Sequence, residues 1–268
     1  MSTQTELIGE HLPSKSHSRE VLDSWLTSEK VEVNRHVLWL LCEKENARGG
    51  VAAKLRDLMQ DHYVAPEATA QRLANWGAPE TAKLLREHLP TKKASRSGDI
   101  GEILATEIAE AYMGYGVPVR RLRWKDGRDT AVRGDDIIGI APGSIGKPSF
   151  LKGESKSREQ LSPSVVREAA TALDRDDGKP SRHSVVFLCN RLREQQKHDE
   201  AAQLEHALLH SFDGHSVEHL LFALSGNNPR RILHSHLTQC TQNQCCRYAV
   251  GVHIEDLGKF IEELFGGF

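Results

Sequence analysis

The 268-residue chain has no apolar run that approaches the roughly eighteen residues a membrane-spanning helix requires. Its opening stretch, MSTQTELIGEHLPSKSHSRE, also lacks the apolar centre of a secretory signal peptide. These two absences argue against a membrane span and against export. We therefore expect a soluble protein of the cytoplasm.

The sequence also lacks an even number of cysteines and an excess of basic residues. The five cysteines are odd in number, and Cys42 and Cys189 stand alone in apolar stretches, which favours a reducing compartment over a disulfide framework. The formal net charge is −2, whereas proteins that hold nucleic acid tightly on their own are usually more basic. Any nucleic-acid role must therefore depend on a local basic patch or on a partner protein.

Hydrophobic residues make up 38% and charged residues 27% of the chain, a composition typical of globular proteins. Residues 1–95 form the first predicted part. Apolar residues recur there at helical spacing from Val31 to Leu89, so we predict an α-helical N-terminal region. The break at Gly77 and Pro79 resembles helix-turn-helix spacing, but core packing or docking onto a partner is favoured over DNA reading.

The polar, basic segment 91–98 marks the predicted boundary with a second part, residues 96–268. In that part the pattern predicts a helix beginning at Asp99, three strands, further helices, two more strands and a last helix. The predicted strands are 119–124, 130–140, 149–157, 219–224 and 247–254, with a hairpin turn at Asp126-Gly127 between the first two. This order predicts the α/β class, with a mixed β-sheet flanked by helices.

Three charged residues on the second and third of these strands form the strongest candidate site. Glu154 and Lys156 are two residues apart, so both side chains leave the same face of their strand. Asp136 lies on the preceding strand, and antiparallel pairing would bring it within reach of Glu154. Carboxylates hold Mg²⁺ or Mn²⁺, and a nearby lysine orients water and offsets charge in phosphodiester hydrolysis. The simpler interpretation is an exposed ion pair between Glu154 and Lys156.

Two further acidic residues are ambiguous. Successive strand residues point to opposite faces, so Asp135 and Asp136 cannot both bind one metal ion. Asp136 is favoured because two isoleucines follow it directly, which leaves Asp135 to cap the turn or to bind through water. Glu102 either completes the catalytic site or forms a capping box with Asp99, three residues before it.

A basic cluster surrounds the predicted hairpin, where DNA contact is favoured over a solvated, ion-paired surface. Its members are Arg120, Arg121, Arg123, Lys125, Arg128 and Arg133. A second group has enough donors for zinc and consists of His234, His236, Cys240, Cys245 and Cys246. Because its spacing matches no common zinc module, zinc binding by this group stays unproven.

One longer pattern resembles a known signature. The segment Gly134-Asp135-Asp136-Ile137-Ile138-Gly139, followed by Gly153-Glu154-Ser155-Lys156, resembles that of the PD-(D/E)XK nucleases. Together with Gly101-Glu102-Ile103-Leu104 and the stretch Pro118 to Lys125, it is similar to a narrower group, the HamA effector nucleases of the Hachiman antiphage defence system. The similarity is strong over residues 97–160 and loose over the last third of the chain.

The resemblance implies a restriction-endonuclease-like core and roles for the matching positions. Asp136 and Glu154 would bind Mg²⁺ or Mn²⁺ together with the main-chain carbonyl of Ser155. Lys156 would act on the attacking water, and Glu102 would be the helix carboxylate that completes the site. The resemblance also implies DNA as substrate and a HamB-like helicase partner that engages DNA and restrains the nuclease.

The leading functional hypothesis is therefore a metal-dependent deoxyribonuclease, an endonuclease that acts as an antiphage effector under the control of a helicase partner. A second hypothesis is a stand-alone restriction or repair endonuclease, for which only the helix-turn-helix-like segment offers a DNA-reading element. A third, from another class, is a non-catalytic adaptor that binds protein through a nuclease fold.

Overall fold

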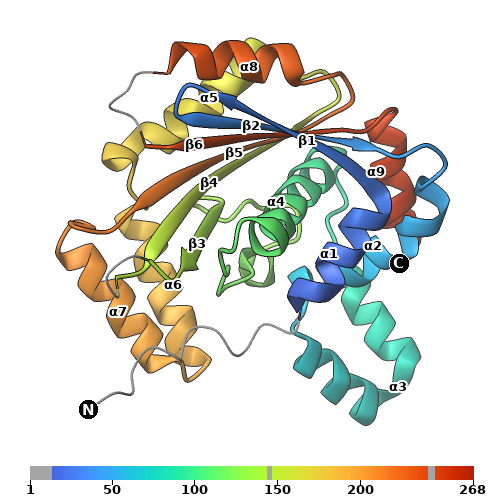
Figure 1. Cartoon of the computed structure of the whole chain (residues 1–268). Coiled ribbons are helices and arrows are strands. Elements are labelled where there is room, and N and C mark those ends of the chain that lie inside the picture. The colour runs from blue at the N-terminus through green and yellow to red at the C-terminus, as the bar shows by residue number, and fades with distance from the viewer. Residues whose placement is uncertain (1–13, 144–146, 241–244) are drawn as a thin grey trace.

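A six-stranded β-sheet forms the centre of the molecule, for which the computed structural model describes residues 14–143, 147–240 and 245–268. Its strands are β1 (Leu26–Val33), β2 (His36–Glu43), β3 (Ile137–Ala141), β4 (Ser149–Arg158), β5 (Val217–Ser225) and β6 (Arg247–His253). They lie in the order β1-β2-β6-β5-β4-β3 (Figure 1). The inner strands pair in parallel, whereas the edge strands β1 and β3 are antiparallel to their neighbours. The predicted mixed sheet of the α/β class is thus confirmed.

Helices cover both faces of this sheet. Their bounds are α1 (Ser14–Trp25), α2 (Arg48–Tyr63), α3 (Pro66–His88), α4 (Lys93–Tyr112), α5 (Pro163–Asp174), α6 (Arg182–Glu194), α7 (His198–Leu209), α8 (Arg230–Gln239) and α9 (Leu257–Gly266). On one face, α1, α2, α4 and α9 share a core with Trp39, and on the other α5 and α8 pack with Leu40 and Leu221 (Figure 1). A third core cluster joins α6 and α7 to Ile138 and Phe150 at the β3–β4 end.

The apolar spacing predicts a helical N-terminal region, but this prediction is wrong for part of the region. Residues 26–43 form β1 and β2, which join the sheet through the parallel pair β2–β6. Leu38 and Leu40 face one core cluster while Trp39 and Leu41 face the other. A strand that is buried on both faces is apolar at nearly every position, so its sequence lacks the alternation that identifies strands. The predicted division near residue 95 therefore crosses one continuous sheet.

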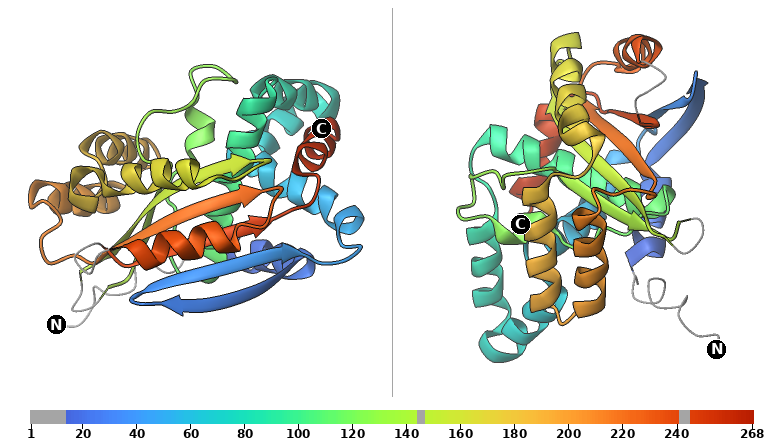
Figure 2. Two further views of the ribbon diagram at one scale, coloured as in Figure 1. Left: turned by 90° about the horizontal axis from the view of Figure 1, so that it is seen from above. Right: turned by 90° about the vertical axis from the view of Figure 1, so that its left-hand side faces the viewer.

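The remainder of the predicted helical region is confirmed by α2 and α3. Gly77 interrupts α3 at the predicted break with a φ of 78°, a left-handed conformation that glycine adopts without steric cost. α3 lies at the margin of the molecule, away from the sheet (Figure 2). Its side chains Leu73 and Trp76 are 45% and 56% exposed. This helix therefore contributes little to the core.

Two predicted strands before β3 are wrong in type or extent. Residues 119–124 lie outside the sheet and include a short 3₁₀-helix, η1 (Arg121–Trp124). Strand alternation would place neighbouring arginines on opposite faces, but Arg120 and Arg121 both direct their side chains into the protein. The predicted strand 130–140 is shorter in the structure, where only β3 forms. The predicted hairpin turn at Asp126-Gly127 joins no two strands of the described chain.

The segment 91–98 is not a linker, because α4 already begins at Lys93. Asp99 therefore lies within the helix, where it accepts a hydrogen bond from the Tyr63 hydroxyl and pairs with Lys125 at 2.6 Å. The capping-box interpretation of Glu102 is consequently wrong. Helices α1 and α8 have no counterpart in the prediction. No helix in the described part of the chain has the length and apolarity that crossing a membrane demands.

Candidate active site

Asp136, Glu154 and Lys156 meet at the end of the β3–β4 pair. In the antiparallel register Ile137 lies opposite Gly153, so the next position outward sets Asp136 opposite Glu154. Lys156 Nζ lies 3.0 Å from Glu154 Oε1, and these two side chains are only 15% and 14% exposed. The pair is thus not the exposed surface ion pair of the simpler interpretation.

Asp136 lies at the centre of this group. Its Oδ2 accepts a hydrogen bond of 2.9 Å from the Ser155 main-chain N–H. Burial raises the pKa of Asp136, while that hydrogen bond and the positive charges of Arg121 and Lys156 act to lower it. The two cations of the site therefore converge on this carboxylate.

Lys156 has a second acidic neighbour besides Glu154. Lys156 Nζ lies 2.9 Å from a carboxylate oxygen of Glu168, which α5 presents from the adjoining face. Burial and then the charge of Asp136 raise the pKa of Glu154 to about 7. Burial opposes the charge of Lys156, but its hydrogen bonds to Glu168 and Glu154 outweigh that effect and raise its pKa. Lys156 is therefore charged at neutral pH. No sequence spacing points to Glu168, because it reaches the site from a different element.

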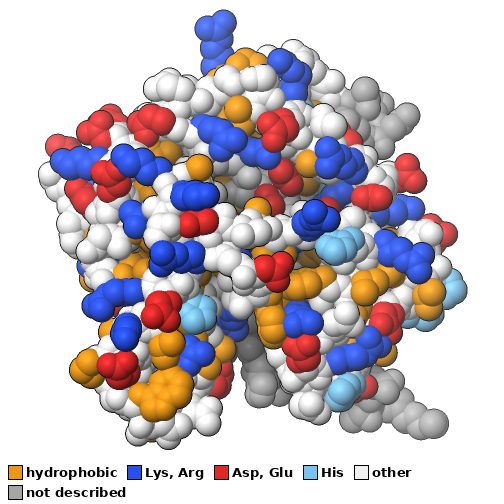
Figure 3. All heavy atoms as spheres, turned by 180° about the vertical axis from the view of Figure 1, so that it is seen from behind, with side chains coloured by type: hydrophobic (Ala, Val, Ile, Leu, Met, Phe, Trp, Pro, Cys, Tyr) orange, Lys and Arg blue, Asp and Glu red, His pale blue; other side chains and the backbone are white. Residues whose placement is uncertain are grey.

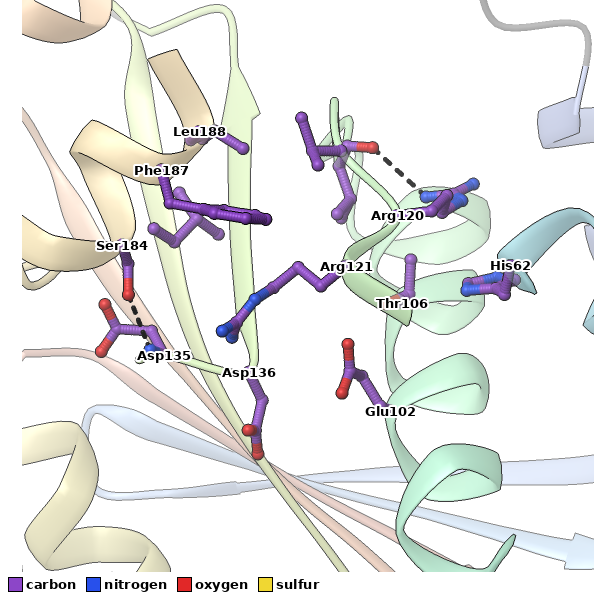
Figure 4. A pocket seen from close by; sticks show the side chains of 13 residues that line it. His62, Glu102, Thr106, Arg120, Arg121, Asp135, Asp136, Ser184, Phe187 and Leu188 are labelled. Carbon is purple, nitrogen blue, oxygen red and sulfur yellow. Dashed lines mark hydrogen bonds between the residues drawn. The ribbon is translucent and has the colours of Figure 1, made fainter. Parts of the chain in front are cut away.

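Glu102 enters the site because α4 crosses β4 at close range. A Cβ atom at Gly101 would lie 2.8 Å from Ser155 Oγ, so a larger residue would push the helix away from the strand. This contact sets the neighbouring Glu102 across from Asp136 (Figure 4). Burial and the charge of Asp136 raise the pKa of Glu102 to about 8. The structure thus brings the predicted helix carboxylate to the other predicted site residues.

Asp135 has a separate task from Asp136. Its Oδ2 accepts hydrogen bonds from the Ser181 N–H at 2.7 Å and the Ser181 hydroxyl at 2.9 Å. Its own N–H donates to the Ser184 hydroxyl (Figure 4). Ser181 is the N-cap of α6, so Asp135 anchors the start of that helix. These contacts engage the Asp135 side chain away from Glu154, which favours Asp136 over Asp135 as the candidate site residue.

A small cavity of about 10 Å³ lies beside the carboxylates, and Arg121 is one of its lining residues. Figure 4 shows the Arg121 side chain reaching from η1 past Glu102 toward Asp136. The sequence assigns Arg121 to the basic hairpin cluster because Arg-Leu-Arg alternates like a strand. Only the collapse of that segment into η1 directs this arginine inward.

The other members of the basic cluster lie outside the cavity or along its wall. Arg123 donates two hydrogen bonds to the Asp61 carbonyl, Lys125 pairs with Asp99, and Arg120 pairs with Glu110 at 2.6 Å. Arg128 and Arg133 have exposed side chains. DNA contact by Arg123, Lys125, Arg128 and Arg133 stays a prediction. On the face that Figure 3 shows, blue basic side chains are interspersed with red acidic ones.

Two of the predicted zinc ligands, His236 and Cys240, contact an arginine instead. Arg247, which is 1% exposed, donates to His236 Nε2 at 3.0 Å and lies 3.8 Å from Cys240 Sγ. Its other terminal nitrogen is 2.6 Å from Asp174. Throughout the described ranges, no three His, Cys, Asp or Glu side chains are gathered as a metal-binding group. The structure therefore gives no support to zinc at this position.

Comparison of the chain with known protein families identifies its family. A HamA family model matches residues 19–266, which is most of the chain and includes every element of the candidate site. The chain belongs to the HamA family. The resemblance to HamA that residues 97–160 indicate is thereby confirmed, and the HamA match extends it to the N-terminal strands and to α9.

A relative within the same family is the Hachiman protein HamA of Bacillus cereus. It is 24% identical over 178 residues, which cover 66% of this chain and 62% of that protein. The match therefore spans less than two thirds of the length of this HamA relative.

Proposed function

We propose that this HamA-family chain is a metal-dependent DNA nuclease that acts as an effector of a Hachiman antiphage defence system. The observation that carries the proposal is the pairing of Asp136 with Glu154 across β3 and β4, with Lys156 beside them. Phosphodiester hydrolysis needs a divalent cation, a polarised water and stabilisation of negative charge. Two carboxylates and a charged lysine at one strand end are suited to these three requirements.

The donor set fits Mg²⁺ or Mn²⁺. Asp136 and Glu154 are hard oxygen ligands whose mutual repulsion a divalent cation would relieve. Ser155 directs its N–H toward Asp136, and a strand residue directs its carbonyl to the same side, which favours that carbonyl as a third ligand. Since two carboxylates are the side chains at hand, water and substrate phosphate would complete the coordination. A bound metal would lower the pKa of a water molecule and neutralise charge on the phosphate.

The chain's own residues supply the remaining steps. Lys156 is a hydrogen-bond donor that carries its charge at neutral pH, so it can orient the attacking water and stabilise the developing negative charge. Glu154 must lose its proton to bind a cation, which its pKa of about 7 permits at neutral pH. Glu102, with a pKa of about 8, holds a proton near neutral pH beside the reacting centre.

We infer that a helicase partner brings DNA to this site. The chain has a net charge of −2, and its Arg123 and Lys125 side chains are bonded to other parts of the protein. The chain alone is therefore expected to bind DNA weakly. The exposed side chains Leu73 and Trp76 of α3 are suited to docking the partner. The fold therefore leaves a helical projection for protein contact beside the proposed catalytic sheet.

Cleavage of linear and circular DNA with Mg²⁺ tests the proposal. The purified chain, alone and with any co-purified partner, would be compared with Lys156→Ala and with Lys197→Ala, a control at a surface lysine paired with Glu200. We expect Lys156→Ala to lose at least about 100-fold of the activity and Lys197→Ala to retain it. Survival of cleavage in a folded Lys156→Ala variant would overturn the assignment. Absence of cleavage by the wild type under every condition would favour the non-catalytic adaptor.

A further inference from the structure

Arg121 is a buried cation that points into the carboxylate site. It is 8% exposed, lines the cavity together with Glu102 and Asp136, and extends its guanidinium past Glu102 toward Asp136 (Figure 4). Its Nη2 donates a hydrogen bond of 2.5 Å to the Arg133 carbonyl, which fixes the direction of the side chain. Phe187 of α6 lies beside it, with the ring centre 5.9 Å from the guanidinium carbon.

The hydrogen-bonding capacity of Arg121 is only partly used. In the described part of the chain its Nε is buried without a hydrogen-bond partner, and the side chain forms no ion pair. Buried arginines are normally paired, because an unsatisfied N–H loses its hydration without compensation. Because Arg121 also lines the cavity, its guanidinium is placed to meet an acceptor that arrives from outside.

The charges around the cavity point to the chemistry of that acceptor. The cavity that Arg121 lines is also lined by Glu102 and Asp136, but among the described residues neither carboxylate forms an ion pair with the guanidinium. The positive charges of Arg121 and Lys156 both act on Asp136, so the site offers two cationic side chains to a negatively charged ligand. An enclosed space of about 10 Å³ admits a single atom the size of a water oxygen.

We propose that Arg121 binds a non-bridging oxygen of the substrate phosphodiester at the catalytic centre. A planar guanidinium that forms no ion pair within the described protein can bind phosphate oxygens through its N–H groups. The phosphate would then lie between the Asp136–Glu154 pair and Arg121, with one oxygen in the small cavity. This assignment rests on the proposed nuclease function and adds a substrate-binding residue to it.

The test compares Arg121→Gln and Arg121→Lys with Arg193→Gln, a matched control at a surface arginine of α6 that pairs with Glu205. Cleavage would be measured on the chain with its co-purified partner. Mn²⁺ affinity would be measured by calorimetry on each variant. DNA affinity would be measured as a function of salt in a Lys156→Ala background, so that the substrate stays intact.

We expect Arg121→Gln to lower kcat/KM by at least about 100-fold and to reduce the slope of log affinity against log salt by about one. Mn²⁺ affinity should stay equal or increase, because a positive charge beside Asp136 has been removed. Arg121→Lys should restore part of the salt slope but little of the cleavage, since lysine lacks the planar edge.

Three results separate the possible errors. Unchanged cleavage and an unchanged salt slope in Arg121→Gln would overturn the phosphate role of Arg121 and leave the proposed nuclease intact. Parallel losses of thermal stability, Mn²⁺ binding and cleavage would show that Arg121 only supports the fold, and would overturn the assignment as well. A wild type that cleaves no DNA contradicts the proposed function, and the salt slopes then still decide whether Arg121 contacts phosphate.

Discussion

Two glutamates on α4, Glu102 and Glu107, lie five residues apart and have opposite electrostatics, with Glu107 buried and Glu102 partly buried. Glu107 accepts hydrogen bonds from His62 at 2.7 Å and from the Ser18 hydroxyl, and Arg120 lies 3.5 Å away. Burial acts to raise its pKa, but the contacts with His62, Arg120 and Ser18 outweigh that effect and lower the pKa to about 2. Glu102 has no such set of donors, and its pKa is raised to about 8.

The difference teaches that hydrogen-bond and ion-pair partners decide whether the pKa of such a carboxyl group ends above or below its ordinary value. Glu107 is fully satisfied by the fold, and its charge helps to hold α1, α2 and α4 together. Glu102 faces Asp136 in a site that contains more carboxylates than the nearby cations neutralise. A surplus of buried negative charge costs stability unless a cation or substrate compensates it.

The largest effect is expected for the structural acid. Glu107→Ala leaves Ser18 and His62 without their buried acceptor, so the free energy of unfolding at pH 7 should fall by about 3–5 kcal/mol. Glu102→Ala should change it by less than about 1 kcal/mol, because among the described residues Glu102 accepts no hydrogen bond and forms no ion pair that the substitution would break. Urea denaturation of both variants measures this. Equal losses at the two positions would contradict the comparison.

The pKa of Glu154 predicts how metal binding depends on pH. A carboxyl with a pKa of about 7 must release its proton to coordinate a cation, so Mn²⁺ affinity should rise about tenfold per pH unit up to pH 7 and then level off. Calorimetric titration of the chain between pH 5.5 and about 8.5 would show this. Affinity that is constant over that range would mean that Glu154 is not a ligand.

Glu102 should make the protein less stable as pH rises. Its folded-state pKa of about 8 exceeds its ordinary value of 4.5, so the folded state binds the proton more tightly than the unfolded state does. The resulting stabilisation is complete below about pH 4.5 and is lost as pH rises through about 8. Glu102→Gln should therefore melt about 3 °C above the wild type at pH 9, with a smaller gain at pH 6. A wild type that melts higher than the variant at pH 9 would contradict the raised pKa.

The smallest effect is expected at the exposed partner of Lys156. Glu168 is 63% exposed and competes with the site for the lysine. Glu168→Gln should raise DNA cleavage by up to about fivefold, the range expected for loss of an exposed ion pair. Initial cleavage rates at pH 7.5 would measure the change. A loss comparable to that of Lys156→Ala would instead make Glu168 part of the catalytic group.

The sequence predicts most of the strand pair that carries the candidate site, because its signals are local. Asp136 precedes an apolar strand and Glu154 and Lys156 share a parity, so their meeting follows once β3 and β4 pair. The sheet's N-terminal third is missed because β2 is apolar on both faces. The inward turn of Arg121 depends on η1, whose conformation is fixed by tertiary contacts such as the Arg120–Glu110 pair. No spacing within the chain encodes such contacts.

Asp136→Asn tests the central claim most directly, because it keeps the size of the side chain that accepts the Ser155 N–H and removes only its charge. DNA cleavage with Mg²⁺ would be measured for the wild type and this variant, both checked for equal melting temperature. The account predicts cleavage by the wild type and a loss of at least about 100-fold in Asp136→Asn. Equal cleavage by the two folded proteins would contradict a catalytic metal at this strand pair.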